Sequence, residues 1–179
     1  MENNKGFTLI ELLVIIFITI SMTVMVFSNY GKNNEIFALE RSSQKLSQDI
    51  RRAQDMAVSG FEGSVATVGY GVYFNTSSNS SYLIYEEKNE NMWYESSTDS
   101  IKEIINIENG IIICALNDNA STPSALSVSF EPPNPLTYVG GVSSGHEAII
   151  TLCISSDTSK KKYIKVNNVG RVEITNTYP

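Results

Sequence analysis

The chain has 179 residues and a formal net charge of -6 at neutral pH. Without the apolar segment near its N-terminus, roughly 150 residues remain, which is the usual size of one domain with a core of its own. The negative charge argues against a protein that binds nucleic acid through a broad basic surface, because an anionic surface repels phosphate. Any contact with DNA must therefore be local.

A short leader, residues 1–6, precedes an apolar stretch over residues 7–27. As a helix, this stretch is about 31 Å long, which is enough to cross the hydrocarbon core of a bilayer. Glu11 is its one ionisable side chain, and a carboxylate in hydrocarbon costs about 3 kcal/mol. We therefore predict that Glu11 is neutral or has a partner.

The order of these elements differs from that of an ordinary export signal. A secretory signal peptide is cut after its apolar core, whereas the plausible cut here follows Gly6 and leaves the helix in the mature protein. From Lys5, the sequence Lys-Gly-Phe-Thr-Leu-Ile-Glu-Leu-Leu resembles the type III signal of type IV prepilins and type II secretion pseudopilins. The resemblance implies that a prepilin peptidase cuts after Gly6 and methylates Phe7, and that Glu11 directs assembly. A plain signal anchor with an incidental acid is the alternative.

A second helical pattern follows the span and ends near residue 59. Residues 29–34 are polar and poor in helix formers, so they are expected to bend the helix or break it locally. Beyond them, apolar residues recur at helical spacing, with Ser43 in their gap, while charged residues such as Asp49 lie largely off the apolar face. The apolar stripe consists of Ile36, Leu39, Leu46, Ile50, Ala53 and Ala57. We expect residues 28–59 to pack one face on a sheet.

Residues 60–179 are predicted to form a β-rich domain, because apolar residues alternate with a period of two between turn-forming segments. The turn segments are residues 75–81, 132–135, 140–145 and 167–170. The alternating runs are Tyr70, Val72 and Phe74; Leu126, Val128 and Phe130; Ala148, Ile150, Leu152 and Ile154; Ile164 and Val166; Val172 and Ile174. The fold class is therefore α+β and, by the resemblance, pilin-like: a long N-terminal helix, membrane-spanning in its first half, packed on a small antiparallel β-rich domain.

The sequence offers little catalytic chemistry. Cys114 and Cys153 are an even pair in a domain expected outside the cytosol, so a disulfide is permitted, with two buried thiols as the alternative. The lone His146 has no companion ligand, and no nucleophile motif or carboxylate pair stands out. We expect no metal, no cofactor and no enzyme activity. Trp93 and Tyr94 are predicted to be core residues of a strand rather than a contact patch.

Four further segments narrow the resemblance to the GspH/FimT class of minor pilins and pseudopilins: residues 46–54, 130–132, 148–154 and 164–172. The class implies a structural subunit, which in a type II secretion system helps to initiate or cap a short filament. A related minor pilin of the DNA-uptake pilus binds DNA instead, through a C-terminal Gly-Arg-x-Arg. This chain has Gly-Arg-Val-Glu at residues 170–173, so one arginine is present and an acid replaces the other.

A basic group near the C-terminus keeps the DNA interpretation open. Between residues 157 and 175 there are five cations and two acids, Asp157 and Glu173. Lys161, Lys165 and Arg171 are expected to point outward. The cations are Lys160, Lys161, Lys162, Lys165 and Arg171. The preferred alternative is a solvated hairpin, since lysines on strand edges discourage strand pairing.

The sequence thus predicts a minor pilin or pseudopilin, a structural subunit of a type IV pilus-like or type II secretion filament. It is expected to be a single-pass inner-membrane protein with an exported C-terminal domain. Its expected partners are the prepilin peptidase, the membrane and other pilins that pack helix against helix. The alternative is a DNA-binding minor pilin of a competence pilus, with double-stranded DNA as a further partner.

Overall fold

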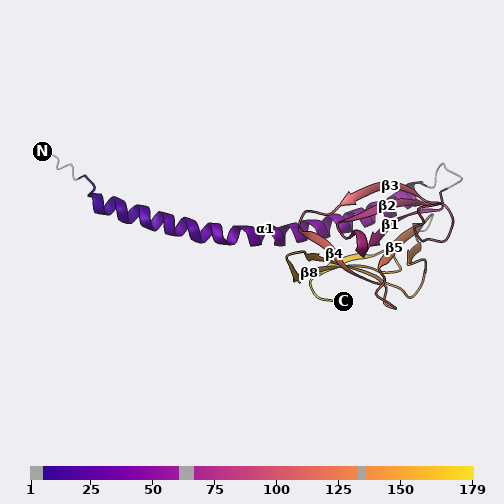
Figure 1. Ribbon diagram of the computed structural model, residues 1–179. Coiled ribbons are helices and arrows are strands. Elements are labelled where there is room, and N and C mark those ends of the chain that lie inside the picture. Colours follow the sequence, from indigo (N-terminus) through magenta and orange to yellow (C-terminus); the bar gives the residue numbers. More distant parts are fainter. Residues whose placement is uncertain (1–5, 61–66, 133–135) are drawn as a thin grey trace. The chain divides into compact units, whose positions relative to one another are not determined.

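The computed structural model describes residues 6–60, 67–132 and 136–179, apart from the side chains of residues 27–33 (Figure 1). The predicted leader before Gly6 and residues 133–135 of a predicted turn lie outside this description. The chain divides into two compact units, Met1–Glu35 and Ile36–Pro179. Helix α1 (Leu9–Ser59) begins in the first unit, and all the strands belong to the second. The predicted α+β class is therefore confirmed.

The predicted break in the helix is wrong, because residues 29–34 are helical within α1. Polar residues such as asparagine lower helix propensity by only a few tenths of a kcal/mol each. Once a helix has formed on both sides, adding a residue between costs less than starting a new helix. The strong helical pattern on either side therefore outweighs the weak local propensity.

The second part of α1 packs its apolar stripe on the strands. Five stripe residues are at most 4 % exposed: Leu39, Leu46, Ile50, Ala53 and Ala57. Ser43, in the gap of the stripe, is also buried, and its hydroxyl donates to the carbonyl oxygen of Glu40 at 2.7 Å. Ile36 departs from the prediction, with 48 % of its surface exposed.

Asp49 corrects the expected division of polar and apolar faces. It is 7 % exposed, and its Oδ2 accepts a hydrogen bond from the hydroxyl of Tyr82 at 2.7 Å. Arg52 lies 3.7 Å from the other carboxylate oxygen. A buried carboxylate is tolerated when it is hydrogen-bonded and paired. Asp49 can therefore be buried because Tyr82, on a strand, donates a hydrogen bond to it.

The strands form two antiparallel sheets, here called sheet A and sheet B. Sheet A has the order β3-β2-β1-β5-β6, and sheet B the order β4-β7-β8-β9. The bounds in sheet A are β1 Gly69–Asn75, β2 Ser81–Glu87, β3 Ser100–Asn106, β5 Ala125–Glu131 and β6 Leu136–Val139. Those in sheet B are β4 Ile111–Asn117, β7 Ala148–Ile154, β8 Asp157–Val166 and β9 Val172–Thr175, and a short 3-10 helix, η2, covers Thr76–Ser78.

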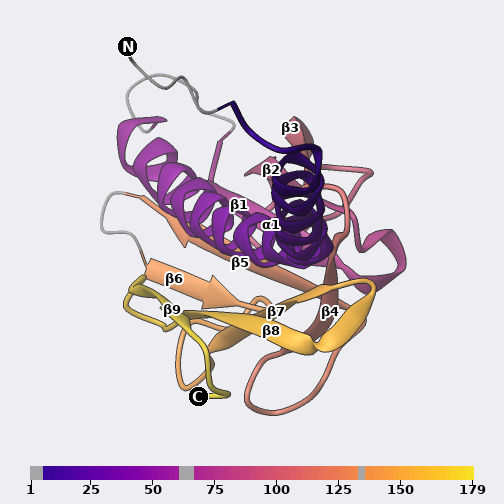
Figure 2. The ribbon, with the colours of Figure 1, turned by 90° about the vertical axis from the view of Figure 1, so that its left-hand side faces the viewer.

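One hydrophobic core joins α1 and both sheets. Figure 2 shows the later part of α1 crossing β1 and β5, with β7, β8 and β9 beyond them. The alternating runs predicted from sequence lie on β1, β5, β7, β8 and β9. Val72, Leu126, Ile150 and Ile164 from these runs are fully buried, so the predicted strands are confirmed. In β5 and β7 the residues between them are buried too, because both faces of these strands are covered.

Ion pairs connect the second part of α1 to the strands and to the connection between β3 and β4. Arg41 donates from Nε and Nη2 to the two carboxylate oxygens of Glu108, at 2.9 and 2.8 Å. Glu40 pairs with Lys162 of β8 at 2.5 Å, and Arg52 pairs with Glu103 of β3 at 2.5 Å. These side chains are partly exposed, so each pair contributes at most about 1 kcal/mol. Their main effect is to fix where the helix lies on the two sheets.

The predicted turn at residues 167–170 joins β8 to β9 and places a glycine against the helix. Gly170 has a φ of 78°, and its N–H donates to the carbonyl of Asn167 at 2.9 Å. A Cβ at this position would lie 2.5 Å from Nε2 of Gln54 and 3.0 Å from Oγ1 of Thr137. The turn thus needs glycine both for its backbone angle and for its contact with α1 and β6.

Candidate assembly segment, basic hairpin and disulfide

The start of α1 holds Glu11 in a local hydrogen-bond arrangement. The backbone N–H and the hydroxyl of Thr8 both donate to Oε2 of Glu11 at 2.8 Å. In return, the N–H of Glu11 donates to Oγ1 of Thr8 at 3.3 Å. This is a capping box, in which the first residue before the helix and the third residue inside it satisfy each other. Among the described residues, Oε1 of Glu11 accepts no hydrogen bond.

The rest of this helical segment offers an apolar surface on all sides. Its large apolar side chains are exposed by 47 % or more, up to 83 % at Phe7. The hydroxyls of Thr19, Ser21 and Thr23 donate to carbonyl oxygens of the same helix at 2.7–2.9 Å. Such internal bonds are what a hydroxyl needs in a medium without water. Among the described side chains of this segment, Glu11 is thus the one charged group, and one of its carboxylate oxygens accepts no hydrogen bond.

Among the described residues, one helix is long and apolar enough to cross a membrane. Its apolar window, Leu9–Val26, has a mean hydropathy of 2.6. The length and composition of this window agree with the span predicted over residues 7–27.

The five cations of the C-terminal hairpin do not form one surface. Successive residues of a regular strand face opposite sides of the sheet, so Lys161 and Lys165 of β8 face away from Lys162, while Lys160 lies where the pairing of β8 with β7 shifts register. Lys160, Lys161 and Arg171 are exposed, whereas Lys162 and Lys165 are half-buried. The expectation that Lys161 and Arg171 point outward is met, while Lys165 is more enclosed than predicted.

Three of these cations form ion pairs with carboxylates. Lys162 pairs with Glu40 at 2.5 Å, Lys165 with Glu147 at 2.8 Å, and Arg171 with Glu173 at 2.6 Å. Lys162 and Lys165 hold the pKa values of Glu40 and Glu147 below their usual range, so both acids stay ionised. With Asp157, four carboxylates accompany the five cations. Within the part of the chain that the structure describes, Lys160 and Lys161 form no ion pair.

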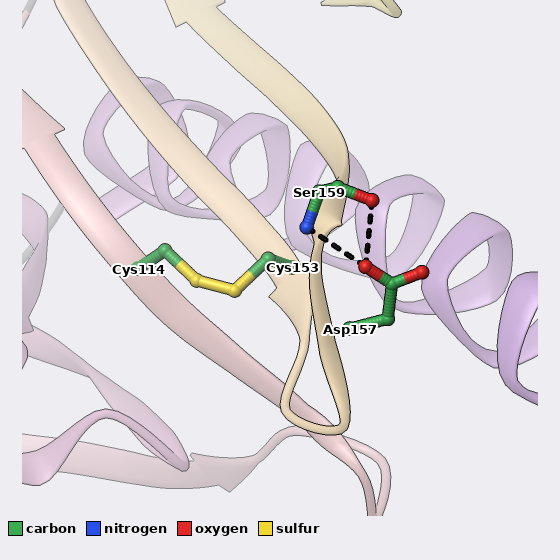
Figure 3. The surroundings of a disulfide bond; sticks show 4 residues. All are labelled: Cys114, Cys153, Asp157 and Ser159. Carbon is green, nitrogen blue, oxygen red and sulfur yellow. Dashed lines mark hydrogen bonds between the residues drawn. A yellow bond between two sulfur atoms is a disulfide. The ribbon is translucent and has the colours of Figure 1, made fainter.

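Cys114 and Cys153 are joined by a disulfide between neighbouring strands of sheet B (Figure 3). Their Cα atoms are 6.0 Å apart and 39 residues separate them in sequence. The pairing of β4 with β7 shifts register between Ile113 and Ala115, so Cys114 is the extra residue of a β-bulge. Cys153 is fully buried. The bond therefore joins β4 to β7. Along the sequence these two strands are separated by β5 and β6, which belong to sheet A.

Removing this disulfide is expected to lower stability by about 4 kcal/mol, because it closes a long loop in the unfolded chain. In the double variant Cys114→Ala/Cys153→Ala this corresponds to a melting temperature lower by about 10 °C, measured by circular dichroism. Reductant should lower the melting temperature of the wild type by a similar amount and leave the double variant unchanged. An equal melting temperature with and without reductant in the wild type would contradict the stabilising role.

Sequence analysis missed two features of the site. Thr8 escaped notice although Thr-x-x-Glu before an apolar run is the pattern of a capping box. Trp93 and Tyr94 were predicted in a strand, which is wrong: they lie half-buried in the loop between β2 and β3. Neighbouring turn-forming residues, from Asn89 to Asn91, were the available signal, because aromatic residues in such surroundings can pack from a loop.

Comparison with known proteins agrees with the N-terminal geometry. Residues 1–27 match the family described as the prokaryotic N-terminal methylation motif. Together with the apolar helix and the antiparallel β domain, this motif marks a type IV pilin-like protein. The motif implies processing by a prepilin peptidase and assembly with other pilins. No curated protein and no solved structure matches the chain.

Proposed function

We propose that this chain is a minor pilin or pseudopilin of the GspH/FimT class, a structural subunit of a type IV pilus-like or type II secretion filament. It is anchored by one span in the inner membrane, with its β domain exported. The peptidase cuts after Gly6 and methylates Phe7. Its function is to pack with other subunits rather than to catalyse a reaction.

The observation that carries this proposal is the state of Glu11. One carboxylate oxygen is held by Thr8, and the other has no partner among the described residues. In an apolar environment a carboxylate needs a cationic partner or a proton. The amine created at Phe7 of a neighbouring processed subunit supplies such a cation. Packing of the helices then places the charge pair inside the filament and fixes their register.

Two further features support the finer parts of the proposal. Disulfides persist in oxidising compartments outside the cytosol, so the Cys114–Cys153 bond favours an exported β domain. The segments that carry the GspH/FimT resemblance lie on the later part of α1, at the end of β5, on β7 and across the β8–β9 hairpin. These elements all contribute residues to the hydrophobic core that α1 shares with the two sheets.

Filament membership is testable with the full chain in cells that contain the peptidase and the other pilins. Filaments sheared from the cell surface, or enriched from the envelope, should contain the processed chain in small amounts relative to the major subunit. Deletion of the major subunit should return the chain to the membrane fraction. A chain that stays in the membrane in both strains would contradict the proposal.

DNA binding is the second candidate function, and the exposed Lys160 and Lys161 favour it. Four nearby carboxylates oppose it, so we expect no salt-sensitive binding of double-stranded DNA by the full chain in detergent. The measurement is a titration over a salt series, beside Arg171→Ala and a variant neutralised at Lys160 and Lys161. DNA capture would be the better interpretation if two results were found together. The affinity would fall with salt by a log-log slope of about 0.9 per phosphate contact, and it would be lower in both variants.

A further inference from the structure

The loop of residues 88–99, between β2 and β3, covers the face of sheet A that points away from α1. The N–H of Tyr94 donates to Oγ of Ser127 at 3.1 Å. The hydroxyl of Ser129 donates to the carbonyl of Met92 at 2.9 Å, and Met92 is 2 % exposed. We call this segment the cover loop. Two serines of β5 thus hold its middle on the sheet.

Aromatic rings make up most of the covered surface. Trp93 meets Tyr73 edge to face, with ring centres 6.3 Å apart, and Tyr94 lies 4.8 Å from Tyr73 and 5.1 Å from Tyr85. A Cβ on Gly71 would lie 2.7 Å from the ring of Tyr85. The Tyr85 ring therefore crosses β1 over this glycine, and its hydroxyl is 2.7 Å from Oγ of Ser129.

An incompletely satisfied carboxyl group lies at the base of the cover loop. Glu87, the last residue of β2, is 0 % exposed. Its Oε1 accepts a long hydrogen bond of 3.3 Å from the N–H of Asn89, and its Oε2 is buried without a partner. A charged carboxylate in this position lacks the donors that water would give it. A proton on the carboxyl group removes that cost.

Asp99 closes the cover loop beside this group. Its Oδ1 accepts from the N–H of Lys88 at 3.1 Å, and its Oδ2 from the N–H of Glu95 at 2.7 Å. Burial raises the pKa of Glu87 to about 7, and the negative charge of Asp99 adds to the rise, although the N–H of Asn89 opposes it. The residue that pins the loop thus disfavours the ionised form of Glu87.

Three other acidic side chains of the neighbouring strands and of the loop have partners of their own. Glu86 pairs with Lys102 at 2.7 Å, Glu131 at the end of β5 accepts from Tyr138 at 2.5 Å, and Glu95 accepts from Asn89 at 2.9 Å. Lys88 and Glu90 are exposed. Among the described residues, no three metal-ligating side chains converge. A proton is therefore the simplest way to neutralise Glu87 in this position.

The backbone of the closed cover loop is also strained. Glu90 and Met92 have φ angles of 63° and 56°, in the left-handed region that disfavours residues with a side chain, at about 1 kcal/mol or more each. Opening the loop releases this strain. A modest free-energy cost of ionising Glu87 at the base of the loop is then enough to shift the equilibrium from the closed towards the open form.

We propose that the cover loop is a pH-sensitive cover, which stays closed over the aromatic face of sheet A while Glu87 is protonated and opens when Glu87 ionises. The pKa of Glu87 is higher in the closed form than its ordinary value of 4.5, so the closed form binds the proton more tightly than the open form. Closure is therefore fully stabilised below about pH 4.5. The stabilisation is lost as the pH rises to about 7, and opening changes no further above that.

The test uses the full chain in detergent micelles between pH 4.5 and 8.5. Trp93 is the one tryptophan of the chain, so its emission reports on the cover loop directly. We expect a red shift as the pH rises towards 7. Amide exchange in residues 88–99, corrected for its intrinsic pH dependence, should rise about a hundredfold over the same interval, while β1 and β5 stay protected.

Two variants separate the role of Glu87 from that of other acids. Glu87→Gln keeps the size of the side chain and removes the titration, so its emission and exchange should not change with pH. Glu90→Gln removes an exposed acid of the same loop and should follow the wild type. A flat response in the wild type, an unchanged transition in Glu87→Gln, or loss of protection in β1 and β5 together with the loop would each overturn the proposal.

Discussion

Replacing Gly6 with leucine is expected to leave the leader attached in cells that contain the prepilin peptidase. A glycine before the cut lets an enzyme approach the backbone closely, and a large side chain blocks that approach. In the chain itself, a Cβ at Gly6 meets nothing within 4 Å, so the substitution does not disturb the protein's own fold. Intact mass spectrometry should find at least a tenfold lower proportion of the trimmed, methylated form.

A size series makes this result specific. Gly6→Ala adds a single methyl group and should be trimmed more efficiently than Gly6→Leu, because the obstruction grows with the side chain. Wild-type chain in cells without the peptidase should keep its full mass and gain no methyl group. Normal trimming of Gly6→Leu would place the cut elsewhere and remove Phe7 as the new N-terminus.

Replacing Glu11 with alanine is expected to leave membrane insertion intact and to reduce incorporation into filaments at least tenfold. Insertion becomes easier without a carboxylate in the span. Incorporation suffers because the amine of the neighbouring Phe7 then lacks its counter-ion in an apolar environment, where an unpaired charge is costly. The measurement compares the amounts of the variant and the wild type in sheared filaments and in membranes.

Two matched variants distinguish charge pairing from helix capping. Glu11→Gln keeps an acceptor for Thr8 but loses the negative charge, so it should fail as Glu11→Ala does. Thr8→Ala keeps the charge but loses the hydroxyl that bonds Oε2 of Glu11, at a cost of about 1 kcal/mol to the helix start, and should still assemble. The reverse pattern would assign Glu11 to capping alone.

The parts of the fold that repeat a strong local pattern were predictable. The span, the buried stripe of α1 and the existence of strands β5 and β7 were each indicated by apolar residues at a regular spacing. β3 was not predicted, since its burial does not alternate cleanly: Ile101 and Ile104 are both exposed, and only Ile105 is buried. It is an edge strand, and most of its side chains lie at the margin of the sheet, where few neighbours cover them.

Contacts between distant segments lay beyond sequence reasoning. The carboxylates that occupy Lys162 and Lys165 are Glu40 on α1 and Glu147 before β7, and nothing in the local sequence pairs them. The burial of Asp49 depends on Tyr82, a residue 33 positions away. Charge counted along a segment therefore overstated the basic character of the hairpin, because the fold brings in acids from elsewhere.

The disulfide has a consequence for how the β domain matures under the export that we propose. The chain contains two cysteines, so oxidation within one molecule has a single possible product. Cys114 precedes Cys153 by 39 residues, so the bond can form only once β7 lies beside β4 in sheet B. Folding thus requires an electron acceptor but no reshuffling of mispaired bonds, which removes a step that takes seconds to hours in proteins with more cysteines.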